Sequence, residues 1–171
     1  MEIEITQATA DDIPVIESMA GIAFRHTYRD ILSTEQIEYM MDWMYSAASL
    51  EKQLLNGHRF FIARYGNTTC GYMSIQKERV DESTVTIYHL HKLYVMPAHQ
   101  GKGIGESLFD HVCMYATEEK DTPKARIELN VNRFNKAIGF YLKKGMKIAH
   151  EGDFPIGSGY YMNDYIMSIE L

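Results

Sequence analysis

YHLHKLYVMPAHQGKGIGE, residues 88–106, is the stretch that decides the fold we expect for this chain. Its first part is rich in β-branched, aromatic and leucine side chains, which predicts a strand that ends before Pro97. Glycines at 101, 103 and 105 then open an amphipathic helical pattern. Glycines at a helix start leave exposed N–H groups at the positive end of the helix dipole, and such groups suit a phosphate or pyrophosphate.

The glycine spacing excludes two common phosphate loops. A Walker loop requires Ser or Thr after Gly-Lys, whereas Gly103 follows Gly101 and Lys102 here. A dinucleotide fingerprint counted from either glycine requires another glycine at 106 or 108, where Glu106 and Leu108 stand. The pattern that is present is Gln-x-x-Gly-x-Gly, and it indicates a different nucleotide-like ligand.

Two motifs resemble the GNAT family of N-acetyltransferases. The sequence from Gln100 to Gly105, preceded by Leu-Tyr-Val-x-Pro, is similar to the family's acetyl-coenzyme A loop. The sequence NKAIGFYLKKGM, residues 135–146, resembles the family's second motif, N-x-A-x-x-F-Y-x-K-x-G-F, at the expected distance. Two departures are Met146 in place of an aromatic residue and Gly139 inside the expected short helix. The coarse pattern of strands and helices extends the resemblance over nearly the whole chain.

The resemblance implies an α/β (α+β) GNAT fold. We therefore expect a mixed, mostly antiparallel sheet of about seven strands, with helices on both faces and a splayed central strand pair. The expected elements are strands at 2–7, 59–64, 70–76, 84–95, 126–132, 146–151 and 161–170, and helices at about 12–28, 34–56, 104–116 and 135–144. A polar loop is expected at 77–83 and another at 152–159.

Composition bounds the class of protein. The 171 residues predict one domain, 1–171, and the net charge of −6 argues against a nucleic-acid partner while favouring a cationic small molecule. Cys70 and Cys113 show no disulfide or metal-ligand spacing, so we expect no metal. No signal-like or membrane-spanning run is present, so we expect a cytoplasmic protein and no membrane partner. The sequence leaves open whether the protein forms a homodimer.

The resemblance also implies the residues that hold acetyl-CoA as cosubstrate. The backbone of the strand end would pair with pantetheine, the N–H groups of the glycine loop would hold pyrophosphate, and polar residues downstream would reach pantetheine or the phosphates. By family analogy, the strand splays from its neighbour after residue 94, and an N–H near Val95 stabilises the oxyanion. The expected set is Leu93, Tyr94, Val95, Gln100, Gly101, Lys102, Gly103, Ile104, Gly105, Glu106, Asn130, Asn135 and Lys143, with Lys144 as an alternative to Lys143.

Two histidines are candidates for the base that deprotonates an amine acceptor. His89 and His91 are two apart on the expected strand, so they should share a face with Leu93 and Val95. His89 falls where histone-type members of the family place a catalytic Glu, and the pair resembles that of arylalkylamine N-acetyltransferases. Histidine titrates near neutral pH and can accept the proton directly or through water. Either ring could instead be a hydrogen-bonded residue of the sheet.

Tyr141 occupies the Phe-Tyr position of the second motif, which implies that it protonates the leaving thiolate. Spacing alone would also allow it to be a packing residue. Neither motif contains cysteine, so we expect direct attack in a ternary complex. Two further segments resemble bacterial polyamine acetyltransferases of the Pai type. They are DFPIGSGYYMNDYIM, residues 153–167, and AFRHTY, residues 23–28.

The acceptor is therefore expected to be a small primary amine such as spermidine or spermine. Glu35, Glu38 and Asp42 share one face of the second helix, as a solvated surface or as an acidic rim for such an amine. The alternatives are a peptide or protein N-acetyltransferase, and a non-catalytic module that binds acyl-CoA as a sensor. Rate loss without loss of coenzyme A affinity in His89→Ala would separate enzyme from sensor.

Overall fold

The computed structural model describes residues 2–171. Its elements are β1 (Glu4–Gln7), α1 (Ile13–Tyr28), α2 (Thr34–Tyr45), α3 (Ala47–Leu55), β2 (Arg59–Tyr65), β3 (Thr68–Val80), β4 (Val85–Val95), α4 (Ile104–Glu119), β5 (Lys124–Asn132), α5 (Ala137–Lys143), β6 (Lys147–Gly157) and β7 (Tyr160–Glu170). All seven strands form one sheet in the order β1-β2-β3-β4-β5-β7-β6. The predicted α/β fold with a mixed, mostly antiparallel sheet is confirmed, because only β4 and β5 pair in parallel.

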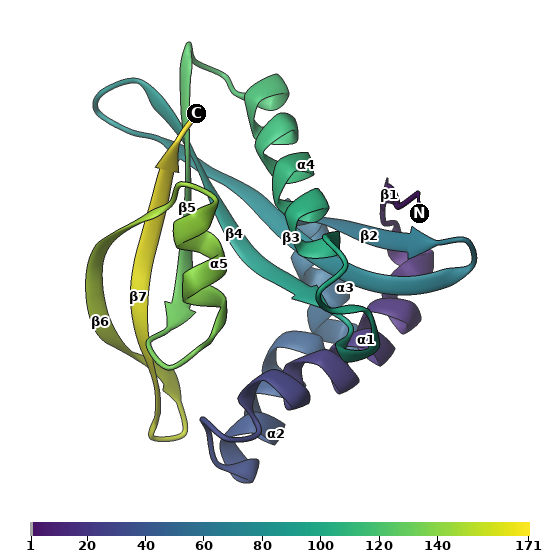
Figure 1. Ribbon diagram of the computed structural model, residues 1–171. Helices are drawn as coiled ribbons and strands as arrows, with labels where there is room; N and C mark the ends of the chain where they lie inside the picture. The colour runs from purple at the N-terminus through teal and green to yellow at the C-terminus, as the bar shows by residue number, and fades with distance from the viewer. Residues whose placement is uncertain (1) are drawn as a thin grey trace.

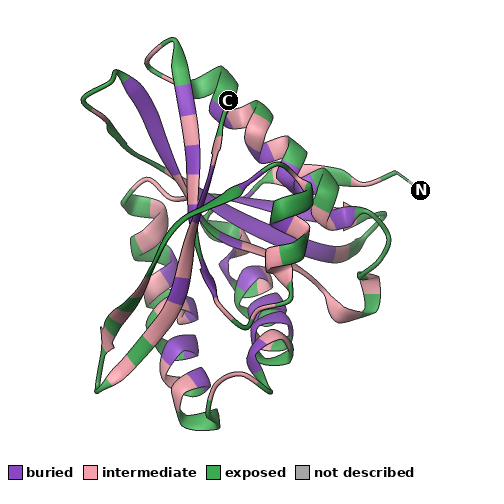
Figure 2. Cartoon of the chain, turned by 60° about the vertical axis from the view of Figure 1, so that its left-hand side comes forward, coloured by how far each residue is buried: buried purple, intermediate pink, exposed green. Residues whose placement is uncertain are grey.

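Helices cover both faces of the sheet, and each face has its own core. Figure 1 shows α4 and α5 over one face and α3 behind the other. One cluster of buried side chains contains Leu108 of α4 and Tyr141 of α5. The second contains Phe24 of α1, Met40 of α2 and Leu50 of α3. Buried residues concentrate on the central strands and the inner helix faces, whereas the edge strand β6 is largely exposed (Figure 2).

The central strand pair separates earlier than the resemblance implied. β4 pairs with β5 only from Val85 opposite Lys124 to His89 opposite Glu128. Beyond His89, β4 keeps its bonds to β3 but has no partner on the β5 side. The splay therefore begins after His89, and the expectation that it begins after residue 94 is wrong. The longer gap between the strands creates the space in which the candidate site lies.

Three differences from the predicted element boundaries exceed three residues. The single helix expected over 34–56 is two helices, because Ser46 is extended (φ −60°, ψ 152°) and its hydroxyl accepts a bond from Ser49 N. Residues 77–80, expected to be loop, continue β3. The loop expected over 152–159 is mostly strand, since β6 and β7 form a long hairpin that turns only at Ser158 and Gly159.

Candidate functional site

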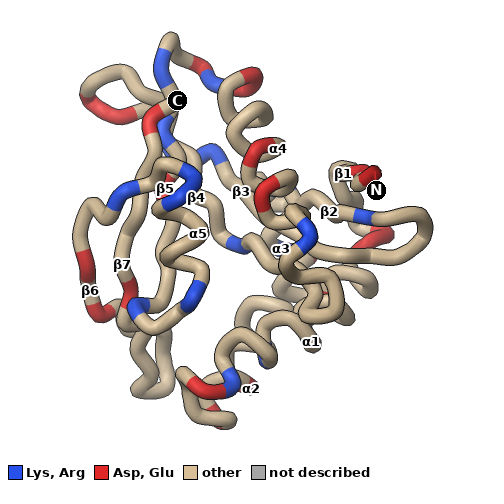
Figure 3. The backbone as a smooth tube through the Cα atoms, viewed as in Figure 1, with Lys and Arg blue, Asp and Glu red and all other residues tan. Residues whose placement is uncertain are grey.

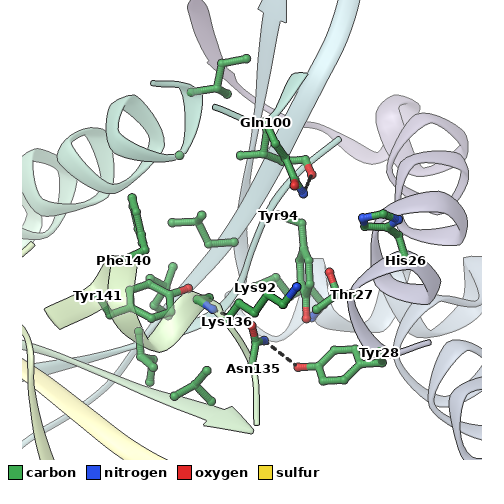
Figure 4. Close-up of a pocket in the computed structure, with 18 of the residues that line it drawn as sticks. His26, Thr27, Tyr28, Lys92, Tyr94, Gln100, Asn135, Lys136, Phe140 and Tyr141 are labelled. Atoms are coloured by element: carbon green, nitrogen blue, oxygen red, sulfur yellow. Dashed lines mark hydrogen bonds between the residues drawn. The ribbon is translucent and has the colours of Figure 1, made fainter. Parts of the chain in front are cut away.

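A cavity of about 1140 Å³ occupies the gap between β4 and β5. Its walls come from the end of α1, the second half of β4, the glycine loop, the start of α4, the end of β5 and α5. Figure 4 shows that Tyr28, Lys92, Gln100, Asn135 and Tyr141 reach into it from different elements. The cleft thus lies between the two cores, and side chains from both cores line it.

The glycine loop holds an open backbone surface at the start of α4. Gly101 and Gly103 have φ of +77° and +80°, a left-handed conformation that favours glycine. Gly103 is the residue before α4, and no side chain caps the helix there. A Cβ at either glycine would meet nothing within 4 Å, so the space in front of the loop is free. The unpaired first-turn N–H groups of α4 suit an anionic group such as a pyrophosphate.

The end of β4 presents backbone to the cleft. Leu93 and Val95 face the α4–α5 core, and Tyr94 faces the core of α1–α3. Gln100 Nε2 donates to the Val95 carbonyl at 3.3 Å, which connects the glycine loop to this strand end. Gly71, opposite Val95 on β3, is required because a Cβ there would lie 2.7 Å from the Tyr94 carbonyl oxygen. The strands are therefore held close on the β3 side and open on the β5 side.

Tyr141 and Asn135 form the α5 wall of the cleft. Tyr141 is buried among aromatic rings, 6.2 Å from the Phe109 centroid and 5.3 Å from that of Phe140. Burial raises its pKa, so the phenol keeps its proton at neutral pH. Asn135 Oδ1 accepts from Ala137 N at 2.8 Å, and its Nδ2 donates to the Tyr28 hydroxyl at 3.5 Å. Asn135, one residue before the N-cap Lys136, therefore bonds to the first residue of α5 and ties the start of that helix to α1.

The two histidines do not share a face with Leu93 and Val95, which corrects the sequence prediction. Ser74 pairs with Lys92 and Ile75 with Leu90, so His91 is an extra residue in β4, a β-bulge. The bulge reverses the alternation of side chains. The His91 ring stacks on that of His58, which follows α3, at 4.4 Å between centroids, and lies tilted against the His89 ring at 4.5 Å. Both histidines therefore lie on the α3 side of the sheet.

His89 is engaged away from the cleft. Its Nδ1 lies 3.4 Å from Glu78 Oε1, and this bond lowers the pKa of the Glu78 carboxyl. Glu78 is itself at a second irregularity, in β3, that leaves it without a partner on β4. His89 is not part of the cavity wall, whereas His91 is. Loss of water contact, with His89, His58 and Lys92 nearby, lowers the pKa of His91, so its ring is neutral at pH 7 and a weak base.

Lys92 is a cleft residue that we did not select from the sequence. Only 6% of it is exposed, and its Nζ donates to Gln53 Oε1 of α3 at 2.7 Å. Nζ also lies 5.5 Å from the Tyr45 ring and 5.3 Å from the Phe60 ring. Burial lowers the pKa of this amine to about 7. The bulge at His91 turns Lys92 to this side, and a bulge has no reliable sequence signal.

Most of the predicted site residues meet at this one cleft. The wall contains His91, Leu93, Tyr94, Val95, Gln100, Gly101, Gly103, Ile104, Gly105, Glu106, Asn130, Asn135 and Tyr141. Lys102, Lys143 and His89 are not in it, and Lys144 instead pairs with Asp110 of α4 at 2.7 Å and Glu106 at 3.5 Å. Tyr28 is a second residue that we missed. From the sequence we included it only as the last residue of the segment AFRHTY.

Residues 2–171 contain no group of three or more His, Cys, Asp or Glu side chains placed to hold a metal ion. Within the same residues, no helix combines the length and hydrophobicity needed to cross a bilayer. Cys70 and Cys113 are free thiols.

A splayed strand pair, an open glycine loop at a helix start and a buried tyrosine on the next helix define an α/β acyltransferase domain. The profile of the acetyltransferase (GNAT) domain matches residues 28–151. This chain belongs to the GNAT family and is an acetyltransferase.

Solved structures share the fold along the whole chain. PaiA N-acetyltransferase from Thermoplasma acidophilum, in complex with coenzyme A, is 25% identical with a TM-score of 0.77, covering 100% of both chains. A GCN5-related N-acetyltransferase from Rhodopseudomonas palustris is 19% identical with a TM-score of 0.79, covering 100% of this chain and 97% of the other. Arabidopsis thaliana Naa50, with the bisubstrate analogue CoA-Ac-MVNAL, is 18% identical with a TM-score of 0.68, covering 100% of both.

Proposed function

We propose that this enzyme transfers the acetyl group of acetyl-CoA to the primary amine of a small molecule, a polyamine such as spermidine or spermine, by direct attack in a ternary complex. The observation that carries the proposal is the cleft at the β4–β5 splay. It brings the open glycine loop, the unpaired edge of β4 and the Tyr141 hydroxyl to one cavity. Those are the parts that a pyrophosphate, a pantetheine arm and a leaving thiolate require.

The donor would lie along the cleft from the glycine loop to Tyr141. N–H groups around Gly103 would receive the pyrophosphate, and the β4 edge at 93–95 would pair with the pantetheine amides, with an N–H near Val95 on the thioester oxygen. Complexes of similar folds support this donor, namely PaiA N-acetyltransferase with coenzyme A and the Salmonella typhimurium acetyltransferase yncA with acetyl-CoA. Lys102 and Lys143 lie outside the cleft wall. That they bind phosphate groups of coenzyme A stays a prediction.

Tyr141 would act as the acid that protonates the thiolate. Its raised pKa means that the hydroxyl is present as a donor throughout the neutral range. The thiol of coenzyme A should have a pKa of roughly 8.5, as a free cysteine has, so a protonated neighbour aids its departure. A module that only senses acyl-CoA would not need a phenol in the cleft, which favours the enzyme over the sensor.

The walls of the acceptor side favour a small cationic amine. Asn130 lines the cleft and donates to Asp164 Oδ2 at 3.4 Å, while the buried Oδ1 of Asp164 has no partner among the described residues. A buried carboxylate behind the wall stabilises a cation in front of it. The exposed face of α2 is less acidic than its sequence indicates, because Arg25 makes two bonds of 2.8 Å to Glu38. Lys and Arg are intermingled with Asp and Glu along the described chain (Figure 3).

The β6–β7 hairpin favours a short acceptor over a folded protein. Tyr39 of α2 donates from its hydroxyl to the Ile156 carbonyl at 2.6 Å, and Gln36 Nε2 donates to the Tyr161 carbonyl at 2.9 Å. These bonds brace the hairpin against α2, next to the end of α1 that lines the cleft. In this proposal the acceptor approaches beside the braced hairpin, where a flexible amine fits more easily than a bulky protein surface.

The test is thiol release from acetyl-CoA, followed with a free-thiol reagent, against polyamines, arylalkylamines, amino acids and short peptides. Saturable release with spermidine or spermine, slowed at least roughly 100-fold in Tyr141→Phe, is the expected result. Release with peptides alone would replace the small amine by a peptide N-terminus. Tight acetyl-CoA binding without release for any acceptor would favour the sensor module.

We also propose that residues 1–171 act as one domain in the cytoplasm. A single sheet that takes strands from both ends of the described chain supports the first point. Two free thiols support a reducing compartment.

A further inference from the structure

Lys92 is a buried amine without a counter-ion. Its side chain is 94% removed from solvent, since 6% is exposed. Among the described residues, no Asp or Glu oxygen lies within 4.0 Å of its Nζ, and its one hydrogen-bond partner is the neutral amide oxygen of Gln53. A buried ammonium is costly unless a carboxylate balances it, so the neutral amine is favoured here.

The contacts of Lys92 and its burial have opposite effects on the pKa of its amine. Gln53 of α3 accepts its hydrogen bond, and the rings of Tyr45 and Phe60 would attract a cation. Burial acts in the opposite direction and dominates, which lowers the pKa to about 7. The titratable neighbours are Tyr45, His58 and His91, and Lys92 lowers the pKa of both histidines. The pKa of the amine therefore lies near neutral pH.

A polar position next to Lys92 lacks a partner. Ser74 of β3 is opposite Lys92 in the register, so the two side chains share a face of the sheet. The Ser74 hydroxyl is fully buried and has no hydrogen-bond partner among the described residues. Buried hydroxyls are rarely left unbonded, so this buried position beside Lys92 suits a water molecule.

Three histidines near Lys92 fit the role of base less well than Lys92 does. His89 is outside the cleft wall and is paired with Glu78. His58 is also outside the wall, and burial lowers its pKa to about 4. The pKa of His91 is lowered further below the working range. A base is most effective when its pKa lies near the operating pH, and Lys92 combines a pKa of about 7 with a place in the cleft wall.

We propose that the neutral amine of Lys92 is the proton acceptor for the amine substrate in acetyl transfer. This inference rests on the proposed function. Lys92 Nζ takes one proton from the substrate ammonium, directly or through a water near Ser74. The freed lone pair forms the C–N bond at the acetyl carbonyl, and the C–S bond breaks. Tyr141 passes the second proton from the new amide nitrogen to the thiolate and is regenerated, and Lys92 releases its proton to solvent.

The first test is the pH dependence of kcat at saturating acceptor, which reports ionisations in the ternary complex. Below its pKa Lys92 is charged and cannot accept a proton, so wild-type kcat should fall as the pH decreases through about 7. Lys92→Met should lower kcat roughly 100- to 10,000-fold, remove that limb and leave the KM for acetyl-CoA unchanged. Lys92→Arg should be equally impaired, because arginine stays charged. Lys52→Met, an exposed lysine of α3, is the matched control and should keep wild-type kinetics.

Gln53→Glu tests the role without removing the lysine. A carboxylate in place of the amide 2.7 Å from Nζ would raise the pKa of Lys92 and should move the acidic limb up by roughly one pH unit or more. A lysine that only packs would leave the limb where it is. An active Lys92→Arg, or an acidic limb that persists in Lys92→Met, would overturn the proposal.

A direct titration separates this proposal from the proposed function. Wild-type protein with ¹³C-labelled lysine, assigned with Lys92→Met, should show one lysine that titrates near 7 by NMR. This readout needs no turnover, so it holds even if every acceptor in the panel fails. A Lys92 signal that titrates near the ordinary lysine pKa of about 10.4 would overturn the inference whatever the acceptor proves to be.

Discussion

At the scale of single residues, the glycine loop depends on a backbone angle that other residues adopt only with strain. The Cβ added by Gly103→Ala would meet no atom within 4 Å, but the alanine would have to adopt a φ of +80°. The left-handed conformation should cost about 1 kcal/mol of unfolding free energy. If the loop relaxes to avoid that cost, its N–H groups turn away from the donor, so we expect a higher KM for acetyl-CoA and an unchanged KM for the amine.

Gly66→Ala is the matched control for this loop. Gly66 also has a positive φ, of +59°, and open space around its Cβ position, but it lies in the β2–β3 turn away from the cleft. Urea denaturation should show a similar loss of stability in both variants, and steady-state kinetics should show the acetyl-CoA defect in Gly103→Ala alone. Equal KM values in the two variants would contradict the assigned role of the loop.

Asp164 is a residue whose charge should weaken the fold. It is 3% exposed, and burial raises the pKa of its carboxyl although Asn130 and Arg133 act the other way. Above its folded pKa it carries a charge that the unfolded chain solvates better, so its cost is present at pH 7 and disappears as the pH falls through that pKa. Asp164→Asn should therefore add about 1–3 kcal/mol at pH 7, with a smaller gain in acid.

Chemical denaturation at a series of pH values checks this expectation. Asp153→Asn is the control, because Asp153 is exposed and paired with Arg133 at 2.8 Å, and its replacement should change stability little. A loss of stability in Asp164→Asn at pH 7 would mean that the carboxylate is compensated in the fold.

At the scale of elements, two hydrogen bonds hold the β6–β7 hairpin against α2, and the proposed function predicts that this brace borders the acceptor's approach. Tyr39→Phe removes the 2.6 Å bond to the Ile156 carbonyl and leaves the ring in place. The hairpin should loosen, with a stability loss of about 1 kcal/mol. We expect the KM for the amine to rise several-fold in steady-state assays while the KM for acetyl-CoA stays constant.

Tyr161→Phe on the same hairpin is the control, since the Tyr161 hydroxyl makes no hydrogen bond to any described residue. It should behave as wild type. If Tyr39→Phe and Tyr161→Phe have the same amine KM, the brace does not shape the acceptor site.

Local patterns predicted the elements whose form depends on their own residues. The strand, bend and helix from β4 to α4 follow from alternation, Pro97 and the glycines. The break between α2 and α3 at Ser46 was not predicted. Ser46 can cap a new helix, but the apolar residues on either side also fit one continuous helix, and tertiary packing decides between the two. The length of the β6–β7 hairpin and the bulge at His91 depend on partner strands, which the sequence does not identify.

The same distinction applies to the site. Gly103, Asn135 and Tyr141 stand in local motifs, and the structure brings them to the cleft as expected. Tyr28 meets Asn135 from 107 residues away, and Lys92 meets Gln53 from 39 residues away. Contacts at such separations are set by packing of whole helices on the sheet, so they had no sequence signal.

At the scale of the whole molecule, the cleft joins two cores that the sheet otherwise keeps apart. Leu93 and Val95 belong to the core under α4 and α5, whereas Tyr28 and Tyr94 belong to the core under α1–α3. A ligand that contacts all four side chains would stabilise both cores together. Such a ligand should shift one cooperative unfolding transition, and not one of two separate transitions.

Coenzyme A at about 100 times its Kd should add about 2.7 kcal/mol to the stability of the folded state. For a chain of this length that corresponds to a rise in Tm of about 5–10 °C. Calorimetry on wild-type protein with and without coenzyme A measures the shift, and Gly103→Ala at the same ligand concentration should show a smaller one. Two transitions, of which coenzyme A moves only one, would contradict a single unit built across the cleft. One transition that moves as a whole is expected, because the ligand then holds β4, α4 and α5 against the helices of the opposite face.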